Sequence, residues 1–120
     1  MSSRVSWTVQ FAIRDGQLDN LRALIPEMAE QTKANEPGTL RYQWSINEDG
    51  TAGHIHERYQ DSDAALTHLA TFNERYAERF MSIADSIRMF VYENPSEALM
   101  QQLAGAVRME TAGGFTRNDG

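Results

Sequence analysis

The spacing of apolar residues changes along this chain between a period of two and a period near 3.6, and this change most constrains the fold. Over residues 5–13 every second side chain is apolar, which predicts a β-strand with one buried face. The apolar members of this strand are Val5, Trp7, Val9, Phe11 and Ile13. After a turn at Asp15-Gly16, apolar residues recur every three or four positions from Leu18 to Met28, which predicts an amphipathic helix. We expect Pro26 to kink this helix or split it, because proline removes a hydrogen-bond donor.

A second block of alternating residues predicts a β-hairpin in the middle of the chain. Residues 39–46 and 53–60 both alternate, and the turn between them ends in Asp49-Gly50, a dipeptide typical of tight hairpins. Asp61 or Ser62 then caps a second helix, whose apolar stripe continues to residue 80. The stripe consists of Ala65, Leu69, Phe72, Tyr76 and Phe80.

The last third of the chain predicts one more strand, a short helix and a possible edge strand. Asn73 marks an expected break that divides the second helix into two. Residues 86–93 alternate as a fourth strand with bulky side chains on both faces. A short helix follows Asn94-Pro95-Ser96-Glu97 and ends at Gly105. Residues 106–111 are then expected to form a short fifth strand.

The resulting order of elements is β-α-β-β-α-β, followed by the small helix and the short strand. This order is ferredoxin-like, and it predicts an α+β fold with an antiparallel sheet and helices packed on one face. A chain of 120 residues is most simply one domain, which we assign to residues 1–112. The Gly113-Gly114-Phe115 segment begins a tail, residues 113–120, that we expect to be flexible.

Composition excludes several classes of function. The chain has no cysteine, which excludes disulfides, thiolate metal sites and a cysteine nucleophile. Its net charge is −6 and it has no cluster of Lys and Arg, so nucleic acid is not an expected partner. The first residues contain no apolar run long enough for a signal peptide or a membrane anchor. We therefore expect a cytoplasmic protein with no membrane partner.

The sheet face that points away from the helices is polar and yet bulky. An open antiparallel face in water would explain it, and so would a homodimer in which two such faces meet. We expect the homodimer, because the face assigned from the alternation carries Arg, Tyr and Phe but neither Lys nor Glu. His54 and His56 share this face, but a metal site needs a third ligand, so no metal is expected there. The assigned face comprises Ser6, Thr8, Gln10, Arg41, Gln43, Ser45, His54, His56, Arg58, Phe90 and Tyr92.

Two polar residues are expected on the opposite, helix-facing side of the sheet. Glu57 lies between Ile55 and Tyr59 on its strand, and His68 lies one turn before Phe72 on its helix. A hydrogen bond between Glu57 and His68 is therefore geometrically feasible across the gap between helix and sheet. It is either a satisfied structural pair or a general acid/base in a pocket. The walls of that pocket would be Tyr42, Trp44, Phe72, Tyr76 and Met81.

A motif extends over the segment from Glu36 to Phe72. It consists of Glu-x-Gly before a strand with a Tyr, a Glu near the end of the next strand, then an Asp, an Ala-rich helix start and a His. This motif resembles the antibiotic biosynthesis monooxygenase domain, whose members are dimeric ferredoxin-like α/β barrels. Its features fall on Glu36, Gly38, Tyr42, Glu57, Asp61, Ala64, Ala65 and His68.

The resemblance implies a monooxygenase that needs no cofactor and acts on a small aromatic, quinol-like or phenol-like molecule. Haem-degrading members carry an Asn in the first strand, which this chain lacks, so haem degradation is not expected. One alternative is a non-catalytic dimer that binds a small ligand or serves in a stress response, and another is an isomerase or other acid/base enzyme. The implied catalytic residues are His68 and Glu57, and the implied substrate-binding residues are Tyr42, Trp44, Phe72 and Tyr76.

Overall fold

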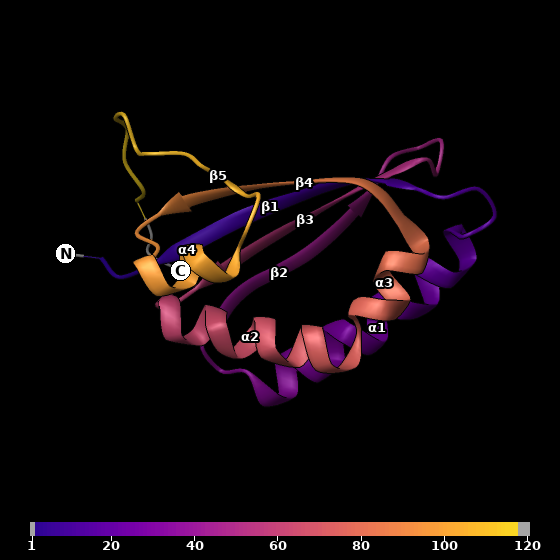
Figure 1. The fold of residues 1–120 in the computed structure, drawn as a ribbon, viewed down its shortest axis with the longest axis horizontal. Helices are drawn as coiled ribbons and strands as arrows, with labels where there is room; N and C mark the ends of the chain where they lie inside the picture. The colour runs from indigo at the N-terminus through magenta and orange to yellow at the C-terminus, as the bar shows by residue number, and fades with distance from the viewer. Residues whose placement is uncertain (1, 118–120) are drawn as a thin grey trace.

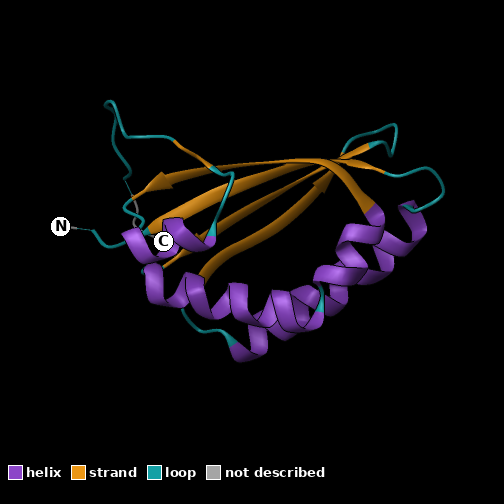
Figure 2. Ribbon diagram, in the orientation of Figure 1, coloured by secondary structure: helices purple, strands orange, loops and turns teal. Residues whose placement is uncertain are grey.

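The computed structural model describes residues 2–117 and contains one mixed β-sheet with helices against one of its faces (Figures 1 and 2). The strands are β1 (Val5–Ile13), β2 (Thr39–Ile46), β3 (Ala52–Tyr59), β4 (Ala84–Glu93) and β5 (Val107–Arg108). The helices are α1 (Leu18–Asn35), α2 (Ser62–Arg75), α3 (Ala77–Ile83) and α4 (Glu97–Gln102). This is the predicted α+β, ferredoxin-like fold. Of the predicted tail, residues 118–120 lie outside the described residues.

The order of strands in the sheet is β2-β3-β1-β4-β5. The pairs β1–β3, β1–β4 and β2–β3 are antiparallel, as the hairpin and the element order predict. β5, which follows the β-α-β-β-α-β order, runs parallel to β4, so the sheet is mixed at this edge. The reason is that α4 carries the chain back across the sheet before β5 begins, which is how a parallel pair is connected.

Apolar side chains fill the space between the sheet and the helices. Burial alternates strictly along β1, and Trp7 is 2% exposed. The ring of Trp7 lies 4.8 Å, centroid to centroid, from the ring of Tyr59 on the neighbouring strand β3. Leu21, Leu24 and Met28 bury the inner stripe of α1 against this layer.

Pro26 neither divides α1 nor ends it, so of the two predicted outcomes, a kink or a split, the split is wrong. α1 is continuous over 18 residues with Pro26 inside it. Pro26 is exposed, and so is Arg22, whose carbonyl would have accepted the missing hydrogen bond. The missing bond therefore falls on the exposed side of α1, and the buried stripe on the other side holds the helix together.

The start of α2 is fixed by a cap and by a close backbone contact. The Asp61 side chain accepts a hydrogen bond from the Ala64 amide at 2.8 Å, which selects Asp61 of the two predicted caps. The Gln60 amide donates to the Gly38 carbonyl at 2.9 Å. A Cβ at Gly38 would lie 2.6 Å from the Ala64 Cβ, so only glycine lets the α1–β2 loop approach α2 this closely. The break between α2 and α3 falls at Tyr76, rather than at Asn73.

The outer face of the sheet carries polar and aromatic side chains that pair across its strands. The Arg58 guanidinium donates to both carboxylate oxygens of Glu93, at 2.8 Å and 3.1 Å. The Arg88 guanidinium lies 5.1 Å from the centroid of the Phe90 ring. Glu93 has a positive φ of 72° at the end of β4 and its carboxylate reaches Arg58, so the assigned absence of Glu from this face is wrong.

Within residues 2–117, no helix combines the length and the apolar character that a membrane span requires.

Candidate active site

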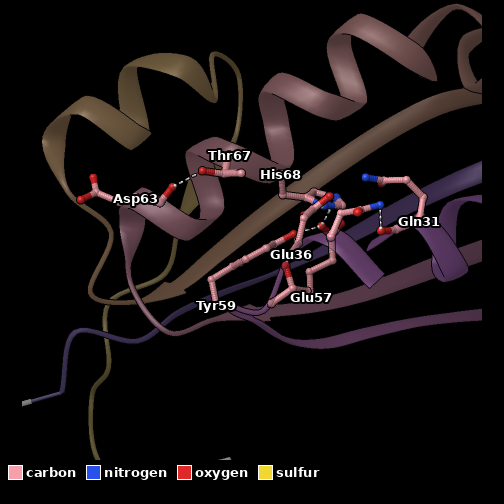
Figure 3. A network of polar contacts seen from close by, with 9 residues as sticks. Gln31, Glu36, Glu57, Tyr59, Asp63, Thr67 and His68 are labelled. Atoms are coloured by element: carbon pink, nitrogen blue, oxygen red, sulfur yellow. Dashed lines mark hydrogen bonds and ion pairs between the residues drawn. The ribbon is translucent and has the colours of Figure 1, made fainter. Parts of the chain in front are cut away.

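His68 lies between two buried carboxylates at the interface of α2 and the sheet (Figure 3). Its Nδ1 lies 2.7 Å from Oε1 of Glu36, and its Nε2 lies 3.3 Å from Oε1 of Glu57. The Tyr59 hydroxyl donates a short hydrogen bond to the same Glu57 oxygen. His68, Glu36 and Glu57 are 5%, 6% and 5% exposed, so the three groups interact in a medium of low polarity.

Three elements bring these side chains together. His68 lies on the buried stripe of α2, one turn after Ala65. Glu57 and Tyr59 alternate on the helix-facing side of β3. Glu36 is the residue directly after α1, and the contact of the α1–β2 loop with α2 places it beside His68. The predicted approach of Glu57 to His68 is therefore present, and Glu36 is a third member that the sequence reading did not place in the site.

The carboxylates control the protonation of His68. Burial by itself would lower the pKa of His68, but the hydrogen bond to Glu36 and the charges of Glu57 and Glu36 outweigh it. The pKa of His68 is therefore raised above its ordinary value of 6.5. A histidine in this position retains its proton at a higher pH than an exposed histidine does.

The pKa of Glu57 is raised as well, because burial penalises its charged form. The charge of His68 and the hydrogen bond from Tyr59 oppose this effect in part. Burial also raises the pKa of Tyr59 well above its ordinary value, and the neighbouring Glu57 adds to that shift. Glu57 and His68 thus form a buried pair in which the pKa of each member is raised, while Tyr59 stays a hydrogen-bond donor.

A cavity of about 180 Å³ opens next to the Glu57–His68 pair. Its wall is almost entirely apolar, and the polar side chains that reach it are Glu57, His68 and Tyr42. The Tyr42 ring lies 5.0 Å from the His68 ring, centroid to centroid. The apolar wall is formed by Trp7, Val9, Met28, Ile55, Leu69, Phe72, Phe80, Met81, Ile87, Met89 and Leu103.

Four of the six implied site residues line this cavity and two do not. His68, Glu57, Tyr42 and Phe72 line it. Trp44 faces the helices but lies farther along β2, where its ring packs 6.2 Å from that of Phe11, centroid to centroid. Tyr76 is buried at the junction of α2 and α3, beneath the Arg75 guanidinium. Neither aromatic side chain contributes to the wall.

Several wall residues were missed, and one of them had a readable signal. Trp7 pairs with Glu57 across β1 and β3, so both side chains project to the same face. An antiparallel alignment of the two strands would have placed Trp7 at the cavity. Met28, Met89 and Leu103 come from three other elements, and no local pattern brings them to a common point.

The described residues hold no group of three or more His, Asp or Glu side chains arranged to bind a metal ion. His54 and His56 lie on the outer face of the sheet, with ring centroids 6.4 Å apart. They are separated from His68 by the thickness of the sheet, because β3 alternates and Glu57 lies on the inner face.

Comparison with known proteins relates the fold of this chain to one family. The family model for antibiotic biosynthesis monooxygenase matches residues 5–73, a range that contains Glu36, Glu57 and His68. No curated protein matches the chain. The chain resembles the crystal structure of MupZ from Pseudomonas fluorescens with a TM-score of 0.78 and 28% sequence identity, over 97% of this chain and 96% of that one.

Two further solved structures share the fold at lower identity. Rv0793 from Mycobacterium tuberculosis is 24% identical with a TM-score of 0.67, over 80% of this chain and 99% of that one. SnoaB from Streptomyces nogalater, described as a cofactor-independent oxygenase, is 15% identical with a TM-score of 0.65, over 79% of this chain and 96% of that one. At these identities the likeness shows the fold alone.

Proposed function

The chain belongs to the antibiotic biosynthesis monooxygenase family, and from this premise we propose that it is a cofactor-independent monooxygenase of a small aromatic, quinol-like or phenol-like substrate. The observation that carries the proposal is the placement of the Glu57–His68 pair at the wall of an apolar cavity of about 180 Å³. An aromatic ring fits such a cavity, and the pair supplies the base that its activation needs.

The proposed reaction begins with removal of the phenolic proton by Nε2 of His68. The charge of Glu57, with its oxygen 3.3 Å from Nε2, stabilises the imidazolium that forms. The phenolate is electron-rich and transfers one electron to O₂, and the resulting radicals combine to form a carbon–oxygen bond. The hydroperoxide then loses water, so that one oxygen atom becomes a carbonyl and the other leaves in H₂O. The substrate loses its O–H and one C–H hydrogen, both of which leave in that water.

The apolar wall favours this chemistry by excluding water. Water would hydrate the phenolate and would weaken the attraction between Glu57 and His68. Tyr42 is well placed to orient the substrate, because it faces the cavity beside His68. Burial raises the pKa of Tyr42, so that its hydroxyl remains a donor for the substrate oxygen.

We also propose that the chain forms a homodimer through the outer face of the sheet. That face presents Arg88 stacked on Phe90, and Tyr92 within 3.4 Å of the Thr8 hydroxyl. Stacked Arg and Tyr side chains are typical of protein interfaces. Sedimentation at micromolar concentration tests the dimer, and a monomer there would contradict it. A cytoplasmic location accords with a chain that has no cysteine to oxidise.

A second candidate function does not use O₂ as a substrate. The protein would then be an acid/base enzyme such as an isomerase, or a protein that binds a small ligand without catalysis. The specific observation is that three cavity residues, Met28, Met81 and Met89, are flexible enough to close around different ligands. A proton-transferring pair in such a cavity would serve an isomerase equally well. A non-catalytic member that binds a small ligand would use the same wall without the pair.

Oxygen uptake with a panel of quinols, naphthols and anthrones separates these functions. We expect uptake by the wild type and a loss of 10²-fold to 10⁴-fold in kcat for His68→Ala, the usual contribution of a general base. Thr67→Ala is the matched control, because Thr67 is the adjacent residue on the exposed side of α2. Uptake that is unchanged in His68→Ala would remove His68 from the reaction. Proton exchange into a bound ligand without oxygen uptake would favour the second function.

A further inference from the structure

Glu36 is a buried carboxylate that the proposed reaction leaves without a role. It follows directly after α1 and is the C-cap residue of that helix. The C-terminal end of a helix carries a partial negative charge, so a carboxylate there is repelled. Burial adds the loss of hydration to this repulsion. A side chain selected only for stability would not be a carboxylate in this position.

The two oxygens of Glu36 have different surroundings. Oε1 lies 2.7 Å from Nδ1 of His68 and accepts a hydrogen bond from the Thr39 hydroxyl at 3.3 Å. Oε2 is buried and has no hydrogen-bond partner among residues 2–117. Buried polar atoms in native proteins are nearly always paired, so an unpaired carboxylate oxygen marks a site of exchange or of ligand contact.

Glu36 also lies between His68 and the outer surface. It lines one groove of about 280 Å³ together with Gly38, Gln60 and Asp63. It lines a second groove of about 390 Å³ together with Lys33 and other residues of α1 and β2. The apolar cavity is on the other side of His68 and does not include Glu36. The imidazole ring therefore connects the apolar cavity beside Nε2 with a buried carboxylate at Nδ1 (Figure 3), and that carboxylate also lines the two outer grooves.

We propose that Glu36 is the positioning and proton-transfer partner of His68: it holds the neutral imidazole with its hydrogen on Nδ1 and exchanges that proton with the outer grooves. The proposal rests on the proposed function for the role of His68 as the base. The imidazolium that forms when Nε2 accepts a proton from the substrate then passes its Nδ1 hydrogen to Oε1 of Glu36. The proton leaves for solvent from the carboxyl group, and Nε2 keeps the one it received. The ring is reset for the next cycle when Nε2 returns its proton to the peroxide intermediate, Glu36 accepts a proton from solvent through the outer grooves, and Nδ1 takes that proton back from Glu36.

The charged and titratable groups around His68 determine what Glu36 can do. The ring is faced by Glu36 after α1, by Tyr42 on β2, and by Glu57 and Tyr59 on β3. Beyond Glu36, the grooves carry Lys33, Arg41, Asp61 and Asp63. Glu36 is the one carboxylate in this set that contacts both the ring and a groove.

Nitrogen-15 NMR of His68 tests the proposal without a substrate. In the wild type, the neutral ring is expected to carry its hydrogen on Nδ1, and a neutral ring with its hydrogen on Nε2 would overturn the proposal before any variant is made. In Glu36→Gln, we expect the pKa of His68 to fall by about 1–3 units, the usual effect of removing an opposite charge at contact distance. Glu30→Gln, an exposed carboxylate on the same helix, is the matched control and should leave the pKa of His68 unchanged.

Exchange of the Nδ1 hydrogen with solvent tests the route itself. We expect this exchange to be slower in Glu36→Gln than in the wild type, because the amide has no acidic proton to pass on. Equal exchange rates, or an unchanged pKa of His68, would overturn the role of Glu36. A wild type that shows the NMR signature and consumes no oxygen would contradict the proposed monooxygenase and leave the Glu36–His68 coupling established.

Discussion

Trp7 and Glu57 occupy paired positions on β1 and β3, so that the buried carboxylate of the sheet lies beside its most deeply buried indole ring. Both side chains reach the same cavity. Glu57 is therefore buried beside the apolar cavity, while the side chains of His68, Tyr59 and Trp7 interact with its carboxylate. Burial raises the pKa of Glu57, and these neighbouring side chains lower it in part. Because the pKa of Glu57 is raised in the folded state, the stability of the protein depends on pH.

Glu57→Gln should flatten the pH dependence of stability. The pKa values of both Glu57 and His68 are raised in the folded state, so the folded protein binds more protons than the unfolded chain. The free energy of unfolding then falls as pH rises from 4.5 for Glu57, and from 6.5 for His68, through the raised folded values. Each unit by which a pKa is raised corresponds to about 1.4 kcal/mol. Glu57→Gln removes the first contribution and reduces the second.

Urea unfolding between pH 5 and pH 8 measures this effect. We expect the difference in unfolding free energy between the wild type and Glu57→Gln to shift against the wild type as pH rises. Parallel curves over that range would show that the protonation of Glu57 is not coupled to folding. Glu30→Gln, which changes an exposed carboxylate, is expected to run parallel to the wild type.

Tyr59→Phe should destabilise the protein and raise the pKa of Glu57 further. The hydroxyl of Tyr59 donates to Glu57, and that hydrogen bond lowers the pKa of Glu57 against the effect of burial. Loss of one partner of a buried hydrogen bond costs about 1–3 kcal/mol. Thermal unfolding and a pH titration of the Glu57 carboxyl carbon by NMR measure the two effects. A variant as stable as the wild type, with Glu57 unshifted, would contradict this account.

Gly38→Ala should loosen the contact between Glu36 and His68. The added Cβ would lie 2.6 Å from the Ala64 Cβ, so the α1–β2 loop must move away from α2. Overpacking of this kind costs about 1–3 kcal/mol. The pKa of His68 should fall at the same time, because its bond to Glu36 raises it.

Gly113→Ala is the matched control for this substitution. Gly113 has nothing within 4 Å of an added Cβ, so a change within about 0.5 kcal/mol is expected. Equal stabilities of the two variants, or an unchanged titration of His68 in Gly38→Ala, would show that the loop contact does not position Glu36.

Arg88→Glu should weaken the proposed dimer without unfolding the subunit. Arg88 is exposed on the outer face of the sheet and stacks on Phe90. The substitution removes the guanidinium that stacks on Phe90 and would bury an unpaired carboxylate in the proposed interface. Sedimentation equilibrium should show a dissociation constant raised by at least tenfold, while the exposed control Arg22→Glu on α1 leaves it unchanged. Equal dissociation constants for Arg88→Glu and the wild type would place the interface elsewhere.

The fold and the pairing of Glu57 with His68 were predictable because each follows from a local period. Alternation along β3 places Glu57 on the inner face, and the stripe of α2 places His68 opposite it. The periodicity of apolar residues predicts which face of a strand or helix a side chain lies on. It does not predict which side chains on a neighbouring element lie opposite it. Trp44 is on the expected face of β2 but lies too far along the strand to reach the cavity.

Glu36 was not predictable as a member of the site for a different reason. It lies in a loop, and the position of a loop residue depends on contacts made far away in the sequence. Here those contacts are the approach of Gly38 to Ala64 and the hydrogen bond from the Gln60 amide. Pro26 shows the converse, because a local rule predicted a break where tertiary packing on the buried side of α1 keeps the helix whole.

The groups that handle protons all come from one part of the chain, whereas the apolar wall of the cavity draws on both parts. Glu36, Glu57 and His68 all precede residue 73, whereas Phe80, Met81, Ile87, Met89 and Leu103 all follow it. Substitutions in the later segment would remodel the chamber around an unaltered acid/base apparatus. The fit of a ligand can thereby be changed through these five side chains while Glu36, Glu57 and His68 are left in place.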